Sequence, residues 1–150
     1  MNTPTSLVLT EDRGPVLAEL ESIAGGAGWC NVSPRVVEDV DPVRVNVFGL
    51  WANRGTPVAT YLTNAPKKGE PVPSTIGVLH TRGRLKPDYL RDLVAGTPLR
   101  VAQNHAQRGL LLEAPADLDV SVVLDVMCRA ARELCEHTLA GGFVVTVYRH

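Results

Sequence analysis

The sequence predicts an α+β domain in which helices pack on a mainly antiparallel sheet. Short alternating or β-branched segments are separated by turn-forming residues, which favours hairpins over parallel crossovers. Three other segments repeat apolar residues at helical spacing between start and stop signals. The chain has 150 residues and 45% hydrophobic content, enough for one core. We therefore expect a single domain over residues 1–150, with the element order α-β-β-β-α-β-β-α-β.

The N-terminal part predicts one short helix after a frayed start. Residues 1–9 are expected to be frayed. Glu11 and Asp12 suit the positive end of a helix dipole, and the apolar residues that follow keep helical spacing over 13–24. The glycines within 25–28 then end the helix, because glycine adopts the left-handed conformation at little cost.

Three strands are expected next, at 43–48, 56–63 and 74–81. Valines within 32–40 are also compatible with one short edge strand before them, because the prolines of this segment favour loop or edge structure. The clearest hairpin joins 43–48 to 56–63 through the turn residues Asn53-Arg54-Gly55. The segment "STIGVLHT", residues 74–81, is expected to be a further strand.

The second half predicts helix, hairpin, helix and strand. Pro87 begins a helix that Gly96 ends. A hairpin then spans 99–112. The longest helix is expected over 119–139, and the β-branched segment 142–148 closes the chain as a strand.

This element order resembles the type III secretion chaperone-like fold, including its YbjN-type relatives. The resemblance covers roughly residues 13–139 and is clearest in "PLRVAQNHAQRGLLLEAPADLDVSVVLDVMCRAARELCEHT", a hairpin, a proline-acid loop and a long helix. The strand at 142–148 and the proline-rich loop 66–73 depart from that pattern. The resemblance implies a homodimeric binding or chaperone-like protein, on fold analogy.

Charge is unevenly distributed along the chain. The formal net charge is −1, made up of −5 in residues 1–42, +7 in 43–110 and −3 in 111–150. The near-neutral total and the 5% aromatic content argue against a strongly nucleic-acid-binding protein. Nucleic acid remains a possible partner that the composition does not favour.

The clearest candidate for a binding site made of polar side chains is "HTRGR" and the residues after it. His80, Arg82, Arg84 and Lys86 form a candidate anion site, because arginine forks bind phosphate oxygens in pairs. The simpler interpretation is a solvent-facing strand end, favoured because no glycine-lysine phosphate loop accompanies the cluster. A phosphate, nucleotide or RNA binder would also use the other cations of the basic middle, namely Arg44, Arg54, Lys67, Lys68 and Arg108.

The three cysteines suggest a reduced, cytoplasmic protein rather than a metal site. Cys128 and Cys135 are about 10 Å apart along the expected helix, too far for one zinc ion. We expect no metal and no cofactor. The chain begins without a recognisable signal peptide and contains no apolar run long enough for a membrane helix. A small enzyme using Cys30 or a histidine is a further alternative; a cysteine–histidine pair would bring Cys30 close to His80 or His105.

The leading functional hypothesis is a non-enzymatic protein-binding or chaperone-like domain, expected as a homodimer. It rests on a sheet with hairpin edges, which must be paired or protected, and on the absence of a catalytic motif. The expected partners are a second copy and, in addition, another protein. The expected interface comprises the 142–148 strand together with Phe48, Leu50, Trp51, Tyr61 and Leu79.

Overall fold

The computed structural model describes residues 3–43 and 55–150, and it confirms the α+β class. After an additional first strand, the elements follow the predicted order α-β-β-β-α-β-β-α-β, with a strand at 28–36 in the place of the predicted strand 43–48. The strand at 58–62 pairs with 28–36 and 74–79, so the predicted hairpin partner of 56–63 is wrong; residues 44–48 lie outside the described residues. In the described residues the elements are β1 (Thr5–Leu9), α1 (Gly14–Ser22), the 3-10 helix η1 (Ala24–Gly26), β2 (Gly28–Val36), β3 (Val58–Leu62), β4 (Ser74–Leu79), α2 (Pro87–Val94), β5 (Arg100–His105), β6 (Gly109–Ala114), α3 (Val120–Glu133) and β7 (Leu139–Arg149).

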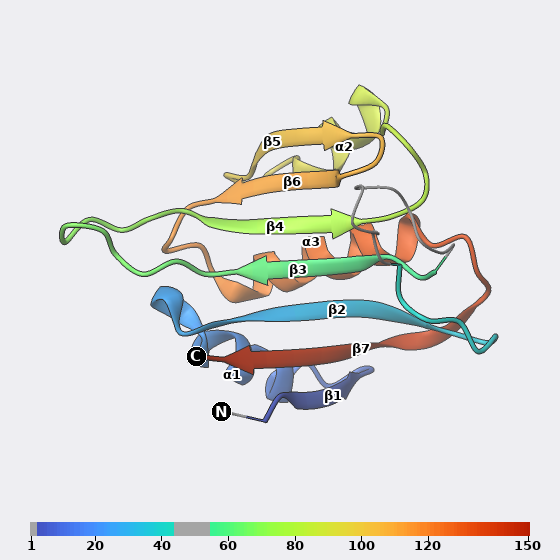
Figure 1. The fold of residues 1–150 in the computed structure, drawn as a ribbon, viewed down its shortest axis with the longest axis horizontal. Coiled ribbons are helices and arrows are strands. Elements are labelled where there is room, and N and C mark those ends of the chain that lie inside the picture. The colour runs from blue at the N-terminus through green and yellow to red at the C-terminus, as the bar shows by residue number, and fades with distance from the viewer. Residues whose placement is uncertain (1–2, 44–54) are drawn as a thin grey trace.

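The strands form one sheet in the order β1-β7-β2-β3-β4-β6-β5. Every neighbouring pair is antiparallel, as predicted. The helices lie behind the sheet in Figure 1, and residues of all three α-helices join the same hydrophobic core as the strands. One face of the sheet is therefore covered by helices, and no helix of the described residues covers the other.

The prediction that residues 1–9 are frayed is wrong for residues 5–9. These residues form β1, which pairs with β7 from Thr5 opposite Val147 to Leu9 opposite Phe143. Leu9 is only 3% exposed. The partner strand lies almost the whole chain away, and its backbone groups and apolar surface hold β1 in place.

The prediction of an edge strand within 32–40 is also wrong, because β2 is an interior strand. It pairs with β7 on one side and with β3 on the other. Pro34 is tolerated because the ladder to β3 ends at Val32, so no bond is lost there. The ladder to β7 changes register between Pro34 and Val36, as at a bulge.

The longest helix is shorter than predicted. α3 ends at Glu133, and Gly141 and Gly142 belong to β7 rather than stopping the helix. Both glycines have positive φ, and a Cβ at Gly142 would lie 2.7 Å from the Leu9 carbonyl oxygen. Gly142 therefore allows β7 to pass close to β1.

Alternation along the central strands separates a buried face from an uncovered one. Side chains pointing toward the helices form the core, and from the strands they include Cys30, Val32, Ala59, Tyr61, Ile76, Val78, Leu110, Leu112, Val145 and Val147. The intervening side chains of β7, β2, β3 and β4 point the other way. We call this surface the open face, and it comprises Trp29, Asn31, Ser33, Val58, Thr60, Leu62, Thr75, Gly77, Leu79, Val144, Thr146 and Tyr148.

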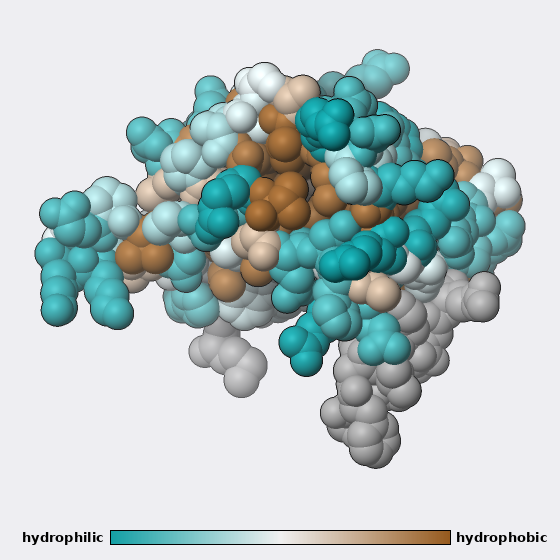
Figure 2. Space-filling view, turned by 90° about the horizontal axis from the view of Figure 1, so that it is seen from above, coloured by the Kyte–Doolittle hydropathy of each residue, from teal (hydrophilic) through white to brown (hydrophobic). Residues whose placement is uncertain are grey.

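The connection between β3 and β4, residues 63–73, projects beyond the end of the sheet (Figure 1) and is hydrophilic at its tip (Figure 2). We call it the arm. Its tip is a closed turn, in which Lys67 and Glu70 exchange two backbone hydrogen bonds of 2.9 Å. Lys68 and Gly69 have positive φ values of 52° and 78°, as the two central residues of a type I′ turn require. The arm is thus an ordered hairpin extension.

Candidate functional site

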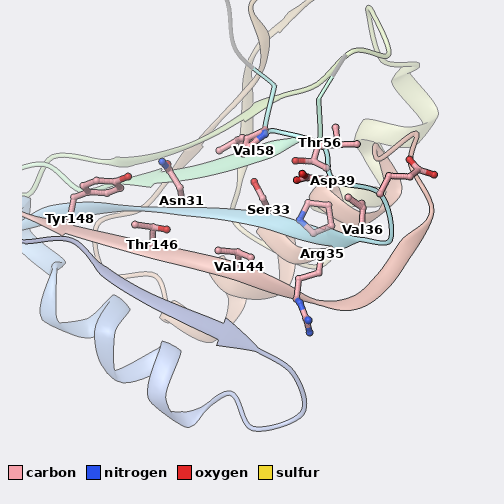
Figure 3. Close-up of a pocket in the computed structure, with 14 residues that line it drawn as sticks. Asn31, Ser33, Arg35, Val36, Asp39, Thr56, Val58, Val144, Thr146 and Tyr148 are labelled. Carbon is pink, nitrogen blue, oxygen red and sulfur yellow. The ribbon is translucent and has the colours of Figure 1, made fainter. Parts of the chain in front are cut away.

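The principal cavity of the described residues lies at one end of the open face. It has a volume of about 490 Å³, within the range of small-ligand pockets. Figure 3 shows side chains of β2 and β7 pointing into it from the sheet and Asp39 approaching from the segment after β2. Its lining comprises Asn31, Ser33, Pro34, Arg35, Val36, Glu38, Asp39, Val40, Pro42, Thr56, Val58, Val144, Thr146 and Tyr148.

Hydrogen bonds fix several polar groups of this cavity. The Thr60 hydroxyl donates to Asn31 Oδ1 at 2.7 Å, which leaves the Asn31 Nδ2 group to act as a donor. The Ser33 hydroxyl donates to the Pro57 carbonyl at 3.0 Å. The lining contains no cysteine and no histidine, so neither a thiol nor an imidazole of the lining contacts a molecule bound there. The arrangement is suited to binding by contact and hydrogen bonding.

A row of large side chains crosses the open face beyond this cavity. Tyr148, Trp29, Leu62 and Thr75 are consecutive cross-strand neighbours on β7, β2, β3 and β4. The rings of Trp29 and Tyr148 stack with centroids 4.9 Å apart. Leu62 is 40% exposed, and Val144 on the same face is 44% exposed. The twelve open-face residues defined above are uncharged, but charged side chains border them. Arg35 follows on β2, Glu38 and Asp39 line the cavity, and Glu113 and Arg100 continue the same side of the sheet on β6 and β5.

The predicted interface residues are divided between two faces. Leu79 and the outward side chains of β7 lie on the open face. Tyr61 is a correction: it is 4% exposed and belongs to the helix-covered core, so it cannot contact a partner. The remaining three, Phe48, Leu50 and Trp51, lie outside the described residues.

The predicted anion cluster is not assembled around His80. The imidazole is fully buried, because His80 continues the inward alternation of Ile76 and Val78. Its Nδ1 accepts a hydrogen bond from the Arg82 backbone N–H at 3.1 Å, and its Nε2 has no hydrogen-bond partner. Burial, with the neighbouring Arg82 charge, lowers the pKa of His80 to about 4. A neutral, buried imidazole does not bind an anion from solvent.

The other cations of the basic middle are dispersed over the surface. Arg82, Arg84 and Lys86 are exposed, and none of the four residues of the cluster lines the cavity on the open face or the two smaller cavities beside α3. Lys67 and Lys68 occupy the arm, whereas Arg108 lies in the turn between β5 and β6. Arg44 and Arg54 lie outside the described residues.

The buried thiols do not fit the predicted cysteine-based alternative. Cys30 is fully buried on the inward face of β2, and burial raises its pKa to about 12. Burial also raises the pKa of Cys128, on α3, to about 11. His105, the other base proposed for Cys30, is the last residue of β5, and its Nδ1 accepts the backbone N–H groups of Gln107 and Arg108 in the following turn.

We therefore expect native protein at neutral pH to expose a single reactive thiol among its three cysteines. Cys135 is half-buried and should react with a thiol reagent first, whereas Cys30 and Cys128 should react at rates set by unfolding. Mass spectrometry of peptides after timed labelling measures this, with urea-denatured protein as the control in which all three react. Rapid native labelling of Cys30 would contradict this burial and revive the nucleophile hypothesis.

Sequence reasoning missed the polar residues of the cavity, such as Asn31, Ser33 and Thr146. A signal for them existed: they alternate with Cys30 and Val32 on β2 and with Val145 and Val147 on β7. Among residues 3–43 and 55–150, no cluster of three metal-ligating side chains is found. No helix in the same residues is long and apolar enough to cross a membrane.

Comparisons with models of known protein families, with curated proteins and with solved structures found no match for this chain.

Proposed function

We propose that this chain is a non-enzymatic, chaperone-like protein-binding domain that forms a homodimer through the open face. The observation that carries the proposal is the composition of that face. It presents Trp29, Tyr148, Leu62 and Val144 on the three neighbouring strands β7, β2 and β3, and charged side chains lie only at its borders. Interface centres are likewise depleted of charge and enriched in aromatic residues.

A sheet face that contacts only water is expected to carry more polar side chains than the open face does. A solvated face of an antiparallel sheet is normally polar, with alternation between an apolar inner side and a hydrophilic outer side. Here β3 carries Val58 and Leu62 outward as well as Ala59 and Tyr61 inward. Apolar residues on both sides of a strand favour a second covering layer, and another protein chain supplies one.

A cytoplasmic location is part of the same proposal. All three cysteines are unpaired, which fits a reducing compartment. The chaperone-like part of the proposal rests on the resemblance in element order alone.

Replacing an exposed apolar residue of this face by arginine is expected to prevent self-association. In Leu62→Arg or Val144→Arg, a charge would have to be buried against the second copy, and dimerisation should weaken by roughly one hundred-fold or more. Both positions are at least 40% exposed, so the fold should tolerate them. Sedimentation velocity against concentration measures the change.

The matched control is Ala95→Arg, an exposed position at the end of α2 on the helix-covered side. It should dimerise like the unaltered chain. Circular dichroism of each variant confirms folding. Equal dimerisation of Leu62→Arg, Val144→Arg and the unaltered chain would show that the open face is not the interface.

A further inference from the structure

Two oppositely charged segments lie at opposite ends of the open face. The arm leaves β3 at its C-terminal end and carries Lys67 and Lys68 on its exposed tip. The acidic segment, which we define as Glu38, Asp39 and Asp41, follows β2 and is anchored at the start of β3 (Figure 1). There, the Thr56 N–H donates to the Asp41 carbonyl at 3.2 Å.

Among the described residues, Glu38 is the one charged side chain of the two segments that has an ion-pair partner, His137. Lys67, Lys68, Asp39 and Asp41 are exposed and form no ion pair within the described residues. Glu38 contacts His137 Nδ1 at 3.0 Å. The tip also carries Glu70, and Arg35 lies beside the acidic segment, so the formal charges are about +1 and −2. The two segments therefore attract each other, but the length of β3 separates them within one chain.

Two copies can pack open face to open face about a two-fold axis that lies in the interface, roughly perpendicular to the strands. This rotation places the arm of each copy over the acidic segment of the other copy. We propose that the homodimer packs open face to open face in this register, with the arm of each copy over the acidic segment of the second. This rests on the proposed function and specifies its partner and geometry. A two-fold interface is self-complementary, so one contact of opposite charges is made twice.

The same axis passes through the apolar row of the open face. Leu62 lies midway along the chain between Thr56, at the acidic segment, and Lys68, at the tip of the arm. At about 3.3 Å per residue of extended chain, Thr56 and Lys68 of one copy would lie roughly 40 Å apart. The axis then places Leu62, Trp29 and Tyr148 against their own copies at the centre, with charges at the rim. The arm continues β3, whereas the acidic segment continues the neighbouring strand β2. For the two segments to meet, the strands of one copy must therefore cross those of the other at an angle, as they do in aligned sheet packing.

Charge exchange between the two segments tests this register. Lys67→Glu with Lys68→Glu, and separately Asp39→Lys with Asp41→Lys, should each weaken homodimerisation at least roughly ten-fold, because like charges meet at both rims. An equimolar mixture of the two variants should form a heterodimer at low salt, since each arm then meets an opposite charge. Sedimentation velocity and native mass spectrometry of the mixture measure both. The matched control, Lys86→Glu with Arg91→Glu on α2, makes the same charge change on the helix-covered side and should dimerise normally.

The outcomes separate the two proposals. Weak homodimers that recover as a heterodimer support the register. Unchanged homodimers of both charge variants, with Leu62→Arg monomeric, overturn the register and leave the open-face dimer standing. A monomeric unaltered chain at high micromolar concentration overturns both, and so does a dimer that none of these substitutions affects. Binding of a different protein by a monomeric chain likewise counts against the register.

Discussion

Leu124→Ala is expected to lower the free energy of unfolding by about 2–5 kcal/mol. Leu124 is fully buried on α3, the helix that packs over the middle of the sheet. Alanine removes apolar contacts and leaves a cavity in a core that relaxes only in part. Urea denaturation monitored by circular dichroism measures the change.

The matched control for this substitution is Leu139→Ala. Leu139 is 42% exposed at the start of β7, so its truncation should cost less than about 1 kcal/mol. Similar costs for Leu124→Ala and Leu139→Ala would contradict the placement of α3 against the sheet.

The buried imidazole of His80 is expected to make the protein less stable as the pH falls from 6.5 toward 4. Above pH 6.5, His80 is neutral in both states. Between 6.5 and about 4, the unfolded chain takes up a proton that the folded chain, with its lowered pKa, does not. Stability is therefore lost on acidification, by up to about 3 kcal/mol over this interval. Urea midpoints measured across that pH range test the slope.

Substitution by asparagine isolates this effect. In His80→Asn the side-chain carbonyl can accept the Arg82 N–H in place of Nδ1, and the residue does not titrate, so the part of the slope due to His80 should disappear. His105→Asn is the control, because His105 accepts backbone N–H groups in a similar way but is exposed. The account of His80 fails if His80→Asn keeps the full pH dependence.

Local signals in the sequence predicted the elements, but strand order depends on distant partners. Pro87 and Gly96 bracketed α2 correctly, and the turn between β5 and β6 was found from its composition. Nothing near Thr5 indicates that it pairs with Val147, and nothing near Pro34 indicates that β2 is interior. Those features require the backbone groups of β7, which follows more than one hundred residues later.

The candidate site was only partly predictable, because β3 is apolar on both sides. Val58 and Leu62 alternate with Ala59 and Tyr61, so the sequence does not say which set faces the helices. The burial of His80 was more accessible, since Ile76, Val78 and His80 share one parity of β4. The nearby Arg82 and Arg84 instead favoured the interpretation of His80 as part of an anion site.

Sedimentation equilibrium of the unaltered protein tests the proposed open-face homodimer most directly. We predict a mass of twice the 16.1 kDa of one chain at high micromolar concentration, falling toward a single chain on dilution. A mass of 16.1 kDa at every concentration would contradict the proposal.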